Sequence, residues 1–176
     1  MLDLNKLIGE LPTITEKMGG LLAESAAFCL EYNRHLTGSE IRVVGSKPKS
    51  MKIVWSFEID HRAQYTYQDK PEVTELGATG VAILLSLELT GYNSVIRSCK
   101  GTGFDYWIGN FEDSKELPFQ KKARLEVSGI LNDSESVFKS RVKQKLKQTD
   151  VSDFMKIPAY VSVVEFSEPV ASLVKK

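Results

Sequence analysis

The sequence predicts an α/β or α+β protein in which helices flank one mixed central sheet. Three observations predict this class. Segments with helical and with strand-like hydrophobic periodicity alternate along the 176 residues. The hydrophobic content of 42% suffices for a core, and the charged content of 26% is usual for a soluble domain. The length fits a single domain over residues 1–176, and no repeat or low-complexity segment divides it.

The first part of the chain predicts a helix followed by a hairpin. "TITE" at 13–16 matches the Ser/Thr-x-x-Glu capping box, and apolar residues then recur at helical spacing over 14–35. "SEIRVVG" (39–45) and "SMKIVWSFEID" (50–60) predict two antiparallel strands, because the second run alternates apolar and polar residues. We expect this helix and hairpin, residues 1–69, to extend the sheet or to cover it.

The rest of the chain predicts a core over residues 70–166 and a C-terminal segment over 167–176. Asp69 and Pro71 are typical of a helix start, and Gly91 is typical of a helix end, so a helix is expected over 70–90. Gly77 and Gly80 should let it approach the sheet closely. Three strands, a basic helix and a last strand are expected at 94–98, 104–109, 123–130, 133–149 and 159–167.

Composition and charge exclude several classes of protein. Lys plus Arg equals Asp plus Glu at 23 each, so no overall field attracts nucleic acid or a membrane, and nucleic-acid contact would need a local basic patch. The two cysteines and the two histidines are too scattered to suggest a disulfide framework or a zinc site. The N-terminus lacks signal-peptide features, and the longest apolar run, "GVAILLSLELTG", is too short to cross a bilayer. We expect a cytoplasmic protein that does not contact membranes.

Acidic residues stand at three places where strands or helices are expected. Asp105 interrupts the aromatic run "GFDYWIG", and Glu126 shares one strand face with Arg124 and Ser128 because strand side chains alternate. The helix over 70–90 adds Glu72 and Glu75, which lie on adjacent parts of one face because they are three residues apart. Three converging carboxylates would repel one another unless a cation lay between them, and hard oxygen ligands suit Mg²⁺. The pattern therefore predicts a magnesium site, provided that the three segments are neighbours.

This order of elements resembles the PD-(D/E)xK nuclease-like superfamily, also called restriction-endonuclease-like. The resemblance covers residues 70–166, and "TELGATGVAILL", "GFDYWIG" and "RLEVSG" look like its helix, its Asp strand and its Glu-x-Lys strand. It implies a metal-dependent nuclease acting on DNA or RNA. Glu75, Asp105 and Glu126 would then hold Mg²⁺ or Mn²⁺.

The sequence departs from the family at the third motif position, where Ser128 replaces the lysine. The family lets this lysine migrate to the following helix, so the resemblance implies that Lys145, or else Arg141, replaces it. Arg141, Lys143 and Lys147 would contact the nucleic acid through its phosphates.

Other interpretations remain open at this stage. Asp105 and Glu126 could lie on the solvated face of a half-exposed strand. The same fold could also serve as a non-catalytic module that binds a partner protein or forms a homo-oligomer, as Ser128 and the neutral net charge favour. Its contact surface would be the aromatic strand 51–59 or an uncovered sheet edge.

Overall fold

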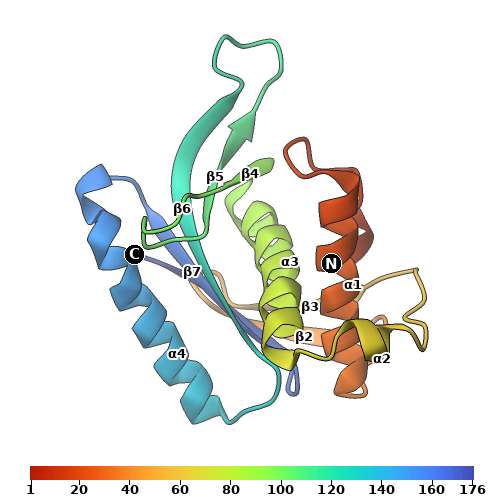
Figure 1. Ribbon diagram of the computed structural model, residues 1–176. Coiled ribbons are helices and arrows are strands. Elements are labelled where there is room, and N and C mark those ends of the chain that lie inside the picture. Colours follow the sequence, from red (N-terminus) through yellow and green to blue (C-terminus); the bar gives the residue numbers. More distant parts are fainter.

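An eight-stranded mixed sheet runs through the molecule, with strand order β1-β3-β2-β8-β7-β6-β5-β4 (Figure 1). The computed structural model describes all 176 residues. Its helices are α1 (Glu16–Tyr32), α2 (Ala63–Thr66), α3 (Lys70–Thr90) and α4 (Glu135–Gln148), and two 3₁₀ segments are η1 (Leu4–Leu7) and η2 (Thr149–Met155). The strands are β1 (Leu2–Asp3), β2 (Glu40–Gly45), β3 (Lys49–Val54), β4 (Ser94–Arg97), β5 (Tyr106–Phe111), β6 (Phe119–Ile130), β7 (Ala159–Glu165) and β8 (Val170–Lys175). The predicted α/β class, a mixed sheet flanked by helices, is confirmed.

The second half of the chain forms the expected order of helix, three strands, helix and strand. After α3, strands β4, β5 and β6 form an antiparallel meander, and α4 then carries the chain to β7, which pairs in parallel with β6. α1 and α3 cover one face of the sheet, and α4 covers the other (Figure 1). β6 therefore lies between the two helices that carry predicted site residues.

The helix α3 begins and ends as its sequence predicts. The Asp69 side chain accepts a hydrogen bond from the Glu72 amide at the N-terminus, and Gly91 takes a left-handed φ of 78° at the C-terminus. Its two glycines, however, face α1 and not the sheet. A Cβ at Gly77 would lie 2.9 Å from the Ser25 carbonyl oxygen, so these glycines permit close packing between the two helices.

By length and composition, α3 is the one helix that could cross a membrane. Its 21 residues are more than the apolar run alone suggested, but 72% of its most apolar window is buried inside the fold. Packing against α1 and the sheet accounts for its apolar character.

Several element boundaries differ from the prediction; β5 spans Tyr106–Phe111 instead of 104–109, and β6 spans Phe119–Ile130 instead of 123–130. Thr15, not Thr13, caps α1, because the Thr13 hydroxyl bonds instead to Ser94 and to the Val95 carbonyl. The second hairpin strand ends at Val54, where the chain leaves the sheet. The C-terminal segment forms β8 in the middle of the sheet, where it pairs in parallel with β2 and antiparallel with β7.

Candidate active site

The sheet forks where β5 separates from β6, and the predicted carboxylates lie at this fork. Pairing between the two strands ends at Tyr106 and Leu125, followed by one bond from the Asp105 amide to the Leu125 carbonyl (2.9 Å). Beyond it, the β6 amides that point toward β5 have no strand partner. The Val127 amide donates to Asp105 Oδ2 at 2.9 Å, and the Gly129 amide donates to Glu75 Oε2 at 3.1 Å. Two acidic side chains thus replace the missing strand.

On its other side, β6 faces α4 and η2 through a ladder of polar side chains. Arg124 bonds to Ser152 (2.5 Å) and Asp153 (3.1 Å), Glu126 bonds to Lys145 and Gln148, and Ser128 accepts from Arg141 (2.9 Å). The ladder forms because two strand residues and four helix residues both advance about 6 Å. This confirms that Arg124, Glu126 and Ser128 share a strand face.

Glu126 is the most deeply buried carboxylate of the site, with 1% of its surface exposed. Its Oε1 accepts from Lys145 Nζ at 2.7 Å and from Gln148 Nε2 at 2.8 Å. Its Oε2 is buried without any hydrogen-bond partner. Burial raises the pKa of Glu126 to about 7; the Lys145 ammonium opposes the rise, and the nearby Asp105 charge adds to it.

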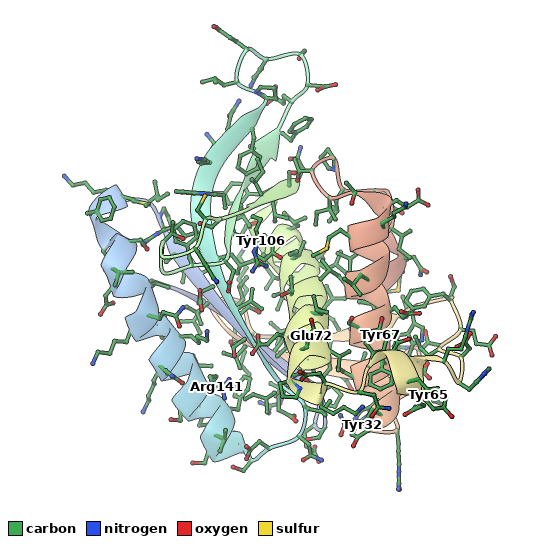
Figure 2. All side chains as sticks on the ribbon, in the orientation of Figure 1. Tyr32, Tyr65, Tyr67, Glu72, Tyr106 and Arg141 are labelled. Carbon is green, nitrogen blue, oxygen red and sulfur yellow. The ribbon has the colours of Figure 1, made fainter.

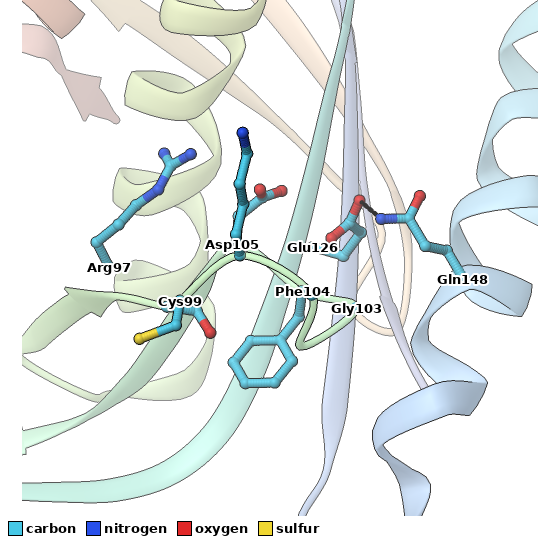
Figure 3. A pocket seen from close by; sticks show the side chains of 10 residues that line it. Arg97, Cys99, Gly103, Phe104, Asp105, Glu126 and Gln148 are labelled. Carbon is cyan, nitrogen blue, oxygen red and sulfur yellow. Dashed lines mark hydrogen bonds between the residues drawn. The ribbon is translucent and has the colours of Figure 1, made fainter.

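Asp105 stands one residue before β5, and its carboxylate lies beside Glu126 in an open cavity (Figure 3). A second cavity of about 380 Å³ continues from it, and Glu75, Asp105, Glu126 and Lys145 all contribute to its lining. The four residues predicted as catalytic therefore share one cavity. Asp105 Oδ2 is used by the Val127 amide.

Glu75 reaches this cavity from the opposite face of the sheet, because α3 and α4 pack on different faces. Its carboxylate accepts from Ser128 Oγ (3.3 Å) and from the Gly129 amide. Burial raises the pKa of Glu75, and the Gly129 amide opposes that rise. No three His, Cys, Asp or Glu side chains lie close enough together to hold one metal ion. The structure thus brings Asp105 and Glu126 together and leaves Glu75 apart, bonded to β6.

The basic residues of α4 divide between its two sides. Arg141 (Figure 2) and Lys145 point toward β6, where Arg141 bonds to Ser128 and Lys145 bonds to Glu126. Lys143 and Lys147 are exposed and lie about 160° around the helix from Lys145, at 100° per residue. The two lysines therefore face solvent on the side of α4 away from the cavity.

Sequence reasoning missed two residues of the site. Arg97 ends β4 opposite Tyr106; it donates to the Tyr106 hydroxyl at 2.8 Å, and its guanidinium lies 4.9 Å from that ring. It lines both cavities, as does Gln148. The position of Gln148 three residues after Lys145 could have identified it, since helical neighbours three apart share a face.

Comparison of this chain with protein-family models and with curated proteins found no match.

Proposed function

We propose that this protein is a metal-dependent phosphodiesterase that cuts nucleic acid, with its catalytic centre at the fork between β5 and β6. The observation that carries the proposal is the buried Glu126 Oε2, which has no hydrogen-bond partner and lies beside Asp105. A buried carboxylate oxygen without a partner is costly, and a bound cation would remove that cost. The order α3-β4-β5-β6-α4-β7 supports the same reading through its likeness to the PD-(D/E)xK nucleases.

Asp105 and Glu126 fit a magnesium ion without help from Glu75. Mg²⁺ is commonly bound by one or two carboxylates, with waters and substrate phosphates in its other positions. The open cavity beside the two carboxylates leaves room for both. When bound, the ion would polarise the phosphodiester and lower the pKa of an attacking water.

Lys145 is the residue that we assign to the role of the missing motif lysine. Its ammonium contacts Glu126 at 2.7 Å, so it favours the ionised carboxylate that a metal requires. It also brings a positive charge to the wall of the cavity, where charge develops on a phosphodiester under attack. Gln148 orients Glu126 through the same oxygen. Ser128 holds Arg141 and Glu75 and takes no part in the chemistry.

The test is cutting of plasmid, single-stranded DNA and RNA in Mg²⁺ or Mn²⁺ by the wild-type chain and by Asp105→Asn. Asparagine keeps an acceptor for the Val127 amide but removes the charge, so the variant should fold and cut at least about 100-fold more slowly. Asp113→Asn, in the exposed loop between β5 and β6, is the matched control and should cut normally. Equal cutting by Asp105→Asn and Asp113→Asn would refute the catalytic assignment.

A second candidate function, a non-catalytic interaction module, is favoured by one observation. Asp105 and Glu75 satisfy backbone amides of β6, so their presence has a structural reason that is independent of metal. The sequence offered two contact surfaces for such a module, the aromatic strand 51–59 and a sheet edge. Met51, Ile53 and Trp55 of the aromatic strand are buried in the core, so the contact surface would be the edge strand β4. Calorimetric titration with Mn²⁺ separates the two functions. Binding heat that the wild-type chain shows and Glu126→Gln lacks supports the enzyme. Absence of binding heat, together with a molecular mass in solution that rises with protein concentration, supports the module.

A further inference from the structure

The two cavities at the fork form one groove with the carboxylates at its middle. The first is lined by the turn between β4 and β5, including Lys100, Gly103 and Phe104, and the second by α3 and α4. Both contain Arg97, Asp105, Glu126 and Gln148. A nucleic-acid strand that reached the carboxylates from the α3 side would therefore continue toward the 98–104 turn.

Two cationic side chains, Arg97 and Lys100, line the end of the groove at the 98–104 turn. Arg97 lies on its wall and is anchored by Tyr106, while its remaining guanidinium donors are not bonded to protein groups. Lys100 is exposed on the turn and makes no ion pair or hydrogen bond. Neither cation forms an ion pair, although the nearby charges of Asp105 and Glu126 act on Arg97. Such cations beside a phosphodiester-cutting centre are suited to a neighbouring phosphate.

An exposed aromatic side chain lies on the element next to this turn. η2 packs on the turn, since a Cβ at Gly103 would lie 2.2 Å from Val151 Cγ2. Phe154 follows three residues later, and side chains three apart in a 3₁₀ helix lie on the same side. Val151 is 63% and Phe154 76% exposed, although both are apolar. The acidic residues of η2, Asp150 and Asp153, are paired with Lys176, and Asp153 also with Arg124, so they leave little free negative charge here.

We infer that the end of the groove over the 98–104 turn, together with the surface of the neighbouring η2, is a binding subsite for single-stranded nucleic acid, in which Arg97 and Lys100 hold a phosphate and Phe154 stacks on a base. The inference rests on the proposed function, because it takes the carboxylates as the point of cutting. Cavities of about 230 and 380 Å³ suit a single strand, whereas a duplex would present its bases to one another and none to Phe154. Stacking on an aromatic ring beside a basic groove is the usual mode of sequence-tolerant single-strand binding.

The test is fluorescence anisotropy in metal-free buffer with labelled oligothymidylate, labelled oligouridylate and a duplex of equal length. The wild-type chain should bind at least one of the single strands more tightly than the duplex. Phe154→Ala should weaken this binding about tenfold, which is the effect of losing one stacked base, and Phe154→Trp should restore it. Lys100→Ala should weaken binding and reduce its salt dependence.

Matched controls separate these effects from general surface changes. Tyr65 is an aromatic residue with 75% exposure on α2, on the opposite side of the molecule from α4 (Figure 2), and Lys52 is an exposed cation on β3. Tyr65→Ala and Lys52→Ala should bind as wild type does. Unchanged affinity in Phe154→Ala, tighter binding to duplex, or no binding would each overturn the inference.

The binding assay and the cutting assay can contradict the two proposals separately. Single-strand binding that depends on Phe154, without cutting in any metal, contradicts the proposed function and leaves the subsite in place. Cutting that is lost in Asp105→Asn, with binding that is insensitive to Phe154, contradicts only the subsite.

Discussion

Glu126 is almost fully buried, and the proposed function would require it to be charged in order to bind a metal. Its raised pKa of about 7 means that the folded state holds a proton more tightly than the unfolded state does. The free energy of unfolding therefore falls as the pH rises from the ordinary value of 4.5 to about 7. The residue destabilises the fold under the conditions in which it would work.

Glu126→Gln should accordingly be more stable than wild type above neutral pH. We expect a gain in the free energy of unfolding of at most about 3 kcal/mol at about pH 8, which shrinks toward zero at about pH 5. Lys145 is partly exposed and can be hydrated when it loses its charged partner. Urea denaturation of both proteins at the two pH values checks the prediction. A variant that is less stable than wild type at the higher pH would show that the ion pair outweighs the burial.

Lys145→Met removes the cation of the ion pair between Lys145 and Glu126. Without the ammonium, the Glu126 pKa should rise further, and metal binding and cutting should both weaken, with cutting falling by about 100-fold. Lys143→Met is the matched control, because Lys143 lies on the solvent side of the same helix. Mn²⁺ titration and cutting rates measure the difference. Similar losses in both variants would mean that the positive charge of α4 acts in general and not at Glu126.

The sequence predicted that three carboxylates meet, but the structure brings only Asp105 and Glu126 together, and Glu75 lies apart, bonded to β6. Period-two alternation correctly placed Glu126 and Ser128 on one face, and the strand order brought Asp105 next to Glu126. The hydrogen bond from the Gly129 amide to Glu75 forms only because β5 separates from β6 before this residue. No local sequence pattern predicts where the two strands separate. Arg97 was missed for a similar reason, since its role follows from its cross-strand neighbour Tyr106.

Between elements, the contact of α3 with β6 depends on a glycine. A Cβ at Gly129 would lie 2.5 Å from the Thr74 carbonyl oxygen, which belongs to helix backbone and cannot turn aside. Close approach at this point is what allows Glu75 to reach the edge of β6.

Gly129→Ala should therefore destabilise the protein by about 1–3 kcal/mol, the usual cost of overpacking, and should displace Glu75. Gly20→Ala in α1 provides a control of opposite sign, because no atom lies within 4 Å of its added Cβ and alanine favours a helix by about 0.5–1 kcal/mol. Thermal or urea unfolding of the two variants measures both effects. Equal stability of the two alanine variants would contradict the close approach.

Helices were easier to predict than the strands at the ends of the chain. α3 has a cap, a first-turn proline and a terminal glycine, each of which acts within its own turn. β8 is buried and strand-like, but its short apolar run acquires its structure from β2 and β7. The stretch after Val54 continues the alternation of β3 without remaining in the sheet, since Trp55 can be buried there without strand partners.

In the whole molecule, β8 joins the N-terminal hairpin to the strands β4 to β7. It is the only strand between β2 and β7, so the sheet is continuous through the last residues of the chain. The sequence predicted that residues 1–69 extend or cover the sheet; they do both, through β1, β3 and β2 at its edge and α1 on its face.

A chain that ends at Pro169 should lose cooperative unfolding, because both neighbours of β8 would be left with unpaired backbone groups in the interior. Removal of Lys176 alone should cost little, since its ion pairs with Asp150 and Asp153 are on the surface. Denaturation profiles of the two truncated chains check this. A sharp, wild-type-like transition in the shorter chain would show that the two halves fold without β8.

The fork has a consequence for how such proteins can change over time. If the protein cuts nucleic acid as proposed, a descendant that no longer did so would still require oxygen acceptors opposite the amides of Val127 and Gly129. Asparagine at 105 and glutamine at 75 would serve that purpose as well as the acids do. Among relatives of this chain, an uncharged amide at 105 would mark an architecture retained without the proposed metal chemistry, whereas acids at the two positions would be expected on either proposed function.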